Sequence, residues 1–242
     1  MQEDVYELFK QYQFNHWWFT GRRKVIHAFM RKFICAKNLE ILDIGSGYGG
    51  LIPTLQTFGV VDTIEPHTAT HEQLEQLGIR TIYVKDFFPI ICPEHRYDIV
   101  TLFDVLEHME DDSRALQVVR NQLLKKQGYC FLTVPAHPGL WTEIDERSNH
   151  FRRYTIKRLR TLLLEAGFTT ISLSYFMCLL FPMDILNRKL QQNQPPKLSE
   201  IKQTPALPAT NNLLETIFGM ESALISRVHF PVGSSIIAKA EG

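Results

Sequence analysis

The sequence predicts an α/β fold with a doubly wound, mostly parallel sheet and helices on both of its faces. Two observations carry this prediction. Strand-like apolar segments alternate with stretches long enough for one helix each, and the first segment leads into a loop with four glycines within residues 45–50. The 242 residues, of which 45% are hydrophobic, can bury one complete core, so we expect a single domain.

Seven segments have the apolar character of strands: residues 41–44, 60–65, 80–84, 97–103, 128–134, 168–175 and 234–240. Two of the intervening helices have clear terminal signals. Acidic residues begin one at 112–126, which ends with Lys125 and Lys126, and the other, at 155–166, closes at Gly167. Residues 135–150 lack periodicity, which predicts a long loop at the carboxyl end of the fifth strand, where a substrate can be held.

The glycine loop continues the first strand as Ile-Leu-Asp-Ile-Gly-Ser-Gly-Tyr-Gly-Gly from residue 41. Its glycines permit positive φ and lack the Cβ atoms that would hold a ligand away from the backbone. A helix beginning near Gly49 would aim free N–H groups at that ligand. The spacing also fits the dinucleotide fingerprint, with Glu65 twenty positions after Gly45. The motif alone therefore leaves a nicotinamide cofactor and S-adenosylmethionine both open.

Charge and cysteine usage indicate which partners and which cellular compartment to expect. Lys plus Arg and Asp plus Glu both total 26, so the balance gives no indication of a nucleic-acid partner. The four widely spaced cysteines form no C-x-x-C pair and read as reduced thiols, and the acidic N-terminus is unlike a signal peptide. We expect a cytoplasmic protein, in which the apolar run 175–183 is too short to span a bilayer yet long enough for peripheral membrane contact.

Four motifs, in this order, resemble those of the class I S-adenosylmethionine-dependent methyltransferases. They are Leu42–Gly49, the acid Glu65, the pair Asp86-Phe87 and the stretch from Tyr97 through Asp104 to His108. The flanking sequences His16-Trp17-Trp18-Phe19 and Pro135-Ala136-His137-Pro138 are similar to small-molecule methyltransferases related to the ubiquinone-pathway O-methyltransferases. The resemblance covers about residues 38–175. It implies a Rossmann-like, seven-stranded, mostly parallel sheet with an antiparallel last strand.

The resemblance also implies one domain in three parts. Residues 1–37 form an N-terminal helical lid, residues 38–175 the cofactor-binding core, and residues 176–242 a C-terminal helical excursion with the last strand. The excursion includes residues 191–212, which are rich in Gln, Asn and Pro.

The implied cofactor is S-adenosylmethionine. Its contacts fall on Asp43, Gly45, Ser46, Gly47, Gly49, Glu65, Asp86, Phe87 and Phe103. The two oxygens of Glu65 suit the two ribose hydroxyls, and Asp86 would accept a hydrogen bond from the adenine amino group. Each acid also has a plainer interpretation: Asp43 and Asp86 as turn residues, Glu65 as a solvent-facing acid at a strand end.

Methyl transfer is an in-line displacement at an activated carbon, so the protein mainly aligns the acceptor and removes one proton. The catalytic candidates are His108, His137 and Asp104, with His150 as a further rival, and His108 has an alternative as a packed structural residue. Asp104, Glu107 and His108 share a helical face that suits a divalent cation, although we expect no required metal.

The substrate-binding candidates combine aromatic rings with guanidinium groups: Trp17, Trp18, Arg22, Trp141, Arg152 and Tyr154. They predict a small, apolar or aromatic acceptor with an acidic group, or a lipid-like one. The alternative is that the tryptophans pack an N-terminal helix onto the sheet and the arginines make surface ion pairs.

Two other functions remain as alternatives. A nicotinamide-dependent oxidoreductase is disfavoured by the acid two residues before the first glycine, by the acid after the third strand and by the lack of a separate catalytic domain. A non-catalytic S-adenosylmethionine-binding protein would keep the glycines and Glu65 without a productive acceptor pocket.

Overall fold

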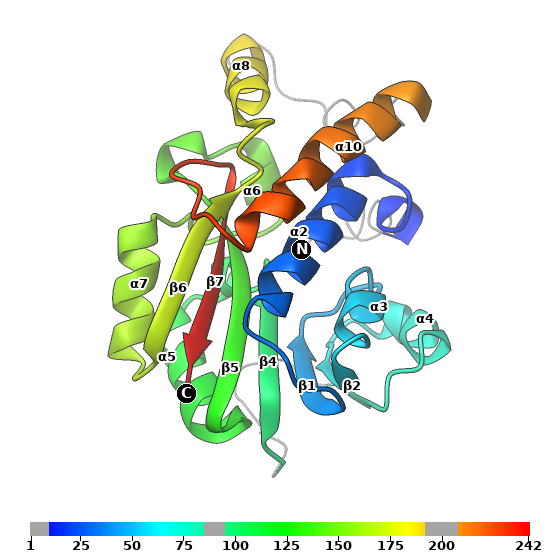
Figure 1. Cartoon of the computed structure of the whole chain (residues 1–242), viewed down its shortest axis with the longest axis vertical. Helices are drawn as coiled ribbons and strands as arrows, with labels where there is room; N and C mark the ends of the chain where they lie inside the picture. Colours follow the sequence, from blue (N-terminus) through cyan, green and yellow to red (C-terminus); the bar gives the residue numbers. More distant parts are fainter. Residues whose placement is uncertain (1–9, 85–94, 192–207) are drawn as a thin grey trace.

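The computed structural model describes residues 10–84, 95–191 and 208–242 (Figure 1). Its centre is a seven-stranded sheet in the order β3-β2-β1-β4-β5-β7-β6. The strands are β1 (Leu39–Ile44), β2 (Gly59–Ile64), β3 (Thr81–Tyr83), β4 (Tyr97–Phe103), β5 (Leu124–Pro135), β6 (Thr169–Phe176) and β7 (Ser235–Glu241).

The strand pairing confirms the predicted fold class. β1 to β5 pair in parallel, whereas β7 runs antiparallel to both β5 and β6. The chain moves outward from β1 to β3 and then returns to β4 on the other side of β1. The crevice at this reversal, outside the carboxyl ends of β1 and β4, is where open α/β sheets bind ligands.

Helices cover both faces of the sheet (Figure 1). They are α2 (Trp17–Arg31), α3 (Ile52–Leu55), α4 (His71–Gln76), α5 (Asp112–Val118), α6 (Glu143–Arg147), α7 (Ile156–Glu165), α8 (Phe181–Gln191) and α10 (Pro208–Ile225). Because successive strand residues point to opposite faces, Ile41 packs in a core with α2, α3 and α10, whereas Leu42 packs in a second core with α5 and α7.

The predicted N-terminal lid is in part a core element. Val25, Ile26 and Phe29 of α2 are fully buried against the sheet. The helix packs along α10, where a Cβ on Gly21 would lie 2.6 Å from the Phe218 ring. The buried face of residues 17–31 therefore belongs to the folded body, and closure over a substrate stays a prediction.

Three sequence-based expectations differ from the structure. The helix expected at 112–126 is α-helical only to Val118 and continues as a π-helical turn, η3 (Val119–Leu123). Lys125 instead lies on β5 and binds Glu40 at 2.7 Å. The helix expected near Gly49 begins at Ile52 and has four residues. The long loop contains a 3₁₀ turn, η4 (Pro138–Leu140), and α6.

No helix in the described ranges has the length and apolar character needed to cross a membrane.

Candidate active site

The glycine loop leaves β1 at the reversal of strand order, and its glycines serve two purposes. Gly45, Gly47 and Gly49 have φ values of 73°, 55° and 80°. A Cβ on Gly45 would lie 2.8 Å from the Val105 side chain, and one on Gly49 would lie 2.5 Å from Leu77, so both positions need glycine for close packing. A Cβ on Gly47 would have nothing within 4 Å, so this residue faces open space.

Asp43 fixes the shape of this loop from below. Its carboxylate accepts hydrogen bonds from the Ser46 hydroxyl at 2.5 Å and the Thr101 hydroxyl at 2.5 Å. Burial raises the pKa of Asp43 to about 6, against the opposing effect of these two hydrogen bonds. Asp43 and Ser46 thus orient the loop, whereas their contact with a cofactor stays a prediction.

Glu65 lies just beyond β2 and is buried, not solvent-facing. Its two oxygens accept hydrogen bonds from the backbone N–H groups of Gly47 at 2.7 Å and His67 at 2.9 Å, while burial raises its pKa. Each carboxylate oxygen keeps a second acceptor position, so two ribose hydroxyls can still donate to it. Asp86 and Phe87 lie outside the described residues.

Residues at the carboxyl end of β4 contact helix α2 on one side and the glycine loop on the other. Phe103 is buried, and Asp104 follows it with a positive φ of 55° while its N–H donates to the Thr133 carbonyl at 3.0 Å. The Arg22 guanidinium pairs with the Asp104 carboxylate, donates to the Thr133 hydroxyl and lies 5.1 Å from the Trp18 ring. Its Nε is buried without a hydrogen-bond partner among the described residues.

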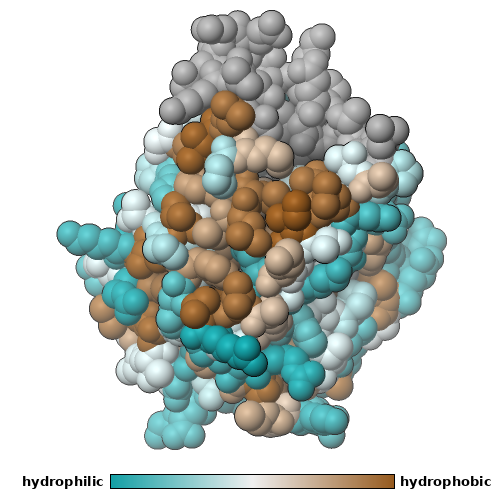
Figure 2. Space-filling model, turned by 45° about the horizontal axis from the view of Figure 1, so that its top comes forward, coloured by the Kyte–Doolittle hydropathy of each residue, from teal (hydrophilic) through white to brown (hydrophobic). Residues whose placement is uncertain are grey.

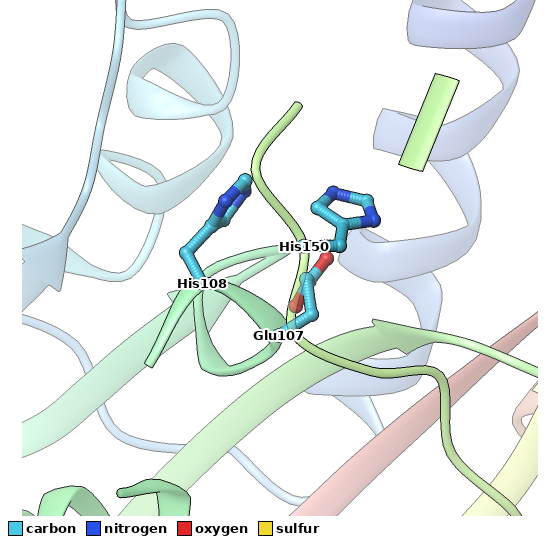
Figure 3. A group of neighbouring side chains, drawn as sticks. All are labelled: Glu107, His108 and His150. Atoms are coloured by element: carbon cyan, nitrogen blue, oxygen red, sulfur yellow. The ribbon is translucent and has the colours of Figure 1, made fainter. Parts of the chain in front are cut away.

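A cluster that combines a carboxylate with two imidazoles follows. Glu107 and His108 belong to the 3₁₀ turn η2 (Leu106–His108), and His150 comes from the segment after α6 (Figure 3). One ligand-type atom from each of the three lies within 4.8 Å of the others. Burial lowers the pKa of His108 to about 4, with His150 adding to the effect, so the ring is neutral at neutral pH.

The segment that carries His150 is held by Asp145, which the sequence analysis did not single out. The buried Asp145 carboxylate accepts two hydrogen bonds from Arg153 at 2.8 Å, one from the Thr142 N–H at 2.8 Å and one from His150 Nδ1 at 2.9 Å. Despite burial, these partners hold the pKa of Asp145 well below its usual range. The Thr142-x-x-Asp145 spacing of a capping box was the available signal.

Two substrate-binding predictions are not supported by the positions of the side chains. Tyr154 is fully buried, and its hydroxyl donates to Asp112 at 3.0 Å. Arg152 pairs with the same carboxylate at 2.9 Å. Both residues therefore tie the long loop to α5, because Asp112 is a buried acid that needs cationic and hydroxyl partners.

The other predicted residues have mixed surroundings. Trp17 packs edge-on against Phe218 of α10, as the packing alternative anticipated. Trp141 is 38% exposed, with its ring N–H bonded to Glu146. His137, at the end of β5, bonds the Gly233 carbonyl at 3.0 Å and stacks on Tyr175. The structure thus brings Arg22, Asp104 and His108 to the end of β4 and leaves His137 at the end of β5.

Glycine backbone and a buried acid at the reversal of strand order are the arrangement with which open α/β sheets bind nucleosides. A family model described as "Methyltransferase domain" matches residues 13–173. Because the match covers more than half of the sequence, the chain belongs to this methyltransferase family.

Individual relatives agree with this assignment. The curated "Ubiquinone biosynthesis O-methyltransferase" of Shewanella pealeana is 29% identical over 101 residues, which are 39% of this chain and 42% of that protein. An S-adenosylmethionine-dependent methyltransferase structure from Thermotoga maritima has a TM-score of 0.58 at 15% identity, covering 98% of this chain and 99% of its own. One from Archaeoglobus fulgidus has a TM-score of 0.56 at 16% identity, covering 91% and 94%.

At these identities the structural likeness shows the fold. Together with the family match, it confirms the class I S-adenosylmethionine-dependent methyltransferase predicted from the motifs, and with it the enzyme class and the cofactor. The chain matches less than half the length of the Shewanella relative.

Proposed function

We propose that the protein transfers the methyl group of S-adenosylmethionine to a small acceptor that is largely apolar or aromatic and carries an acidic group. The observation that carries this proposal is Arg22, a buried guanidinium beside the Trp18 ring at the carboxyl end of β4, with an unpartnered Nε. A planar guanidinium next to a flat ring suits a planar acidic molecule, whose carboxylate can accept from Nε and compete with Asp104 for a second guanidinium nitrogen.

The cofactor occupies the crevice between the glycine loop and the end of β4 in this proposal. The open space at Gly47 admits the cofactor against the backbone, and Glu65 holds the ribose. Phe103 is assigned to the methionine end, and the sequence motif assigns Asp86 and Phe87, which lie outside the described residues, to the adenine. In this arrangement the sulfonium methyl faces Asp104 and His108.

The reaction is an in-line displacement. An acceptor lone pair forms a bond to the methyl carbon as the carbon–sulfur bond breaks, which releases S-adenosylhomocysteine, and an acceptor hydroxyl or amine also loses a proton. His108 is neutral at neutral pH, but a pKa of about 4 makes it a weaker base than an ordinary imidazole. Alignment of the acceptor therefore contributes more to the rate than proton removal does.

A lipid-like acceptor fits a second feature. Exposed apolar side chains occur on α8, on α10 and just before α8: Leu179, Met183, Leu186, Leu213, Met220 and Leu224. Figure 2, turned so that this end comes forward, shows a broad apolar area there. This area supports an apolar acceptor and peripheral membrane contact, and the zero formal charge argues against a nucleic-acid acceptor. The free thiols of Cys35, Cys130 and Cys178 fit a cytoplasmic location.

The experiment incubates the enzyme with methyl-labelled cofactor and either a metabolite and lipid extract or bulk RNA, DNA and protein. We expect label in a small, organic-extractable acid. Arg22→Gln should abolish this labelling, whereas Arg114→Gln, at an exposed position of α5, should leave it unchanged. Label found only in the macromolecular fraction would contradict the proposed acceptor.

A further inference from the structure

We infer that Glu107, His108 and His150 form a binding site for one divalent first-row transition-metal ion of the Zn²⁺ or Co²⁺ type. Their ligand-type atoms lie within 4.8 Å of one another, close enough to meet around one ion after small side-chain rotations. Figure 3 shows the two rings on either side of the Glu107 carboxylate in this view. The sequence pointed to Asp104 as the third member, but Asp104 pairs with Arg22 and His150 takes that place.

The Glu107 carboxylate is the strongest observation for a cation. The residue is 1% exposed, and both oxygens lack a hydrogen-bond partner in the described parts of the chain. Leaving a buried carboxylate unpaired costs several kcal/mol, so native proteins rarely keep one without a compensating charge or proton. A metal ion would supply the charge partner that the buried carboxylate lacks.

Both histidines are oriented as metal ligands usually are. A ligating imidazole bonds a carboxylate or carbonyl through one nitrogen, which fixes the tautomer and leaves the other nitrogen free for the ion. His150 Nδ1 donates to Asp145 at 2.9 Å, which leaves Nε2 as the nitrogen available to an ion. A backbone group of Asn149 bonds the His108 ring.

The backbone holds the two segments of the site together. The Phe151 N–H donates to the Glu107 carbonyl at 2.8 Å, which anchors the residue after His150 to η2. The two imidazole rings lie with centroids 4.7 Å apart at 76°. Because Asp145 is itself held by Arg153, the position of His150 is set by a buried network rather than by a mobile loop.

The donor set also selects the kind of ion. Two imidazole nitrogens and one carboxylate suit Zn²⁺, Co²⁺ or Fe²⁺, whereas Mg²⁺ prefers oxygen ligands and retains water. Three protein ligands leave coordination positions open for an acceptor oxygen. An ion at this site would lower the pKa of an acceptor hydroxyl bound to it. This effect on catalysis rests on the proposed function, whereas the binding of the ion does not. His108 thereby acts as a ligand instead of a base.

The test titrates the metal-free full chain with Co²⁺, followed by visible absorption and calorimetry, and then displaces Co²⁺ with Zn²⁺. We expect one ion per chain. Glu107→Gln and His150→Gln should each lower the affinity at least tenfold, and Asp145→Asn, which removes the orienting charge, about 10- to 100-fold. His27→Gln, a half-buried histidine on α2, is the matched control and should bind the ion as the unmodified protein does.

S-adenosylhomocysteine binding is measured on the same samples, so that a misfolded variant or a failure of the cofactor assignment is seen separately. Absence of Co²⁺ and Zn²⁺ binding in protein that binds S-adenosylhomocysteine would overturn the inference. The same holds for Mg²⁺ binding without Zn²⁺ or Co²⁺ binding, and for an affinity unchanged in the near-isosteric Glu107→Gln.

Discussion

Two loops leave the carboxyl ends of parallel strands in this protein and are stabilised in different ways. The loop 45–50 after β1 is held by Asp43 and Glu65, through the Ser46–Asp43 and Gly47–Glu65 hydrogen bonds, and leaves the space beside Gly47 open. The segment 136–154 after β5 is held by the buried Asp145–Arg153 pair and presents an imidazole, His150. The first loop suits a ligand bound through backbone, the second a ligand bound through an oriented side chain.

This difference explains why the ligand-binding character of the first loop, but not that of the second, can be recognised from the sequence. A loop that binds through its backbone needs glycines at fixed positions, and these are visible in a short motif. A loop that orients one side chain needs a buried charge pair, whose partners are recognised only once the chain is folded. We expect substitutions to separate the two designs: those in the second loop should mainly affect stability, and those in the first should affect cofactor affinity as well.

The largest effect should come from Asp145→Ala. The substitution leaves the Arg153 guanidinium, whose side chain is 7% exposed, without its carboxylate, and breaking a buried pair costs about 3–5 kcal/mol. Urea unfolding of the apo protein measures this loss. Glu143→Gln breaks a 3.8 Å pair with Arg147 that is partly exposed and should cost less than about 1 kcal/mol. Similar losses in both variants would show that the network does not hold the second loop.

The next effect concerns pH and Asp43. Its pKa in the folded protein is raised from 3.8 to about 6, so the folded state holds this proton more tightly than the unfolded chain. Asp43 therefore contributes stability below pH 3.8 that is lost as the pH rises to about 6, roughly 3 kcal/mol because one pKa unit is worth about 1.4 kcal/mol. Unfolding free energies of the protein and of Asp43→Asn across this range should diverge by that amount. Parallel pH profiles would place the carboxyl in a better solvated environment.

The smallest effect on stability, with a larger one on binding, is expected for Gly47→Ala. A left-handed φ of 55° costs an L-residue about 1–2 kcal/mol, and the new Cβ would project into the open space assigned to the cofactor. Gly167→Ala is the matched control, since Gly167 has a φ of 92° and also has nothing within 4 Å of a Cβ. Both variants should lose similar stability, but only Gly47→Ala should lose affinity for S-adenosylhomocysteine. Equal affinities would move the cofactor away from Gly47.

Much of the fold could be predicted because its signals are local. All seven predicted strands occur, and the 97–103 segment has the predicted limits, since a buried parallel strand is a short apolar run. The helix expected to continue to residue 126 gives way to β5 at Leu124, where Lys125 pairs with Glu40 on β1 and Asp98 on β4, contacts between residues distant in sequence. From local composition alone, Lys125 and Lys126 are typical of a helix end.

The site was predicted in part for the same reason. Glu65 was placed correctly at a strand end, but its burial and its bond to Gly47 depend on how β1 and β2 pair. Tyr154 was taken as a substrate contact because aromatic and basic residues are adjacent in sequence there, whereas folding buries its ring and uses Asp112 to satisfy its hydroxyl. The partnership of Glu107 with His150 joins residues more than forty positions apart, and no spacing rule indicates it.

Calorimetry with S-adenosylhomocysteine and NAD tests whether the end of the sheet between the glycine loop and β4 binds S-adenosylmethionine through Glu65. We expect one S-adenosylhomocysteine per chain and no NAD binding. Glu65→Gln should weaken the complex by about 1–3 kcal/mol, because hydrogen bonds to a charged carboxylate are lost, while Glu75→Gln, at an exposed position of α4, should have no effect. NAD binding in place of S-adenosylhomocysteine, or an affinity that Glu65→Gln leaves unchanged, would show that this end of the sheet does not bind S-adenosylmethionine through Glu65.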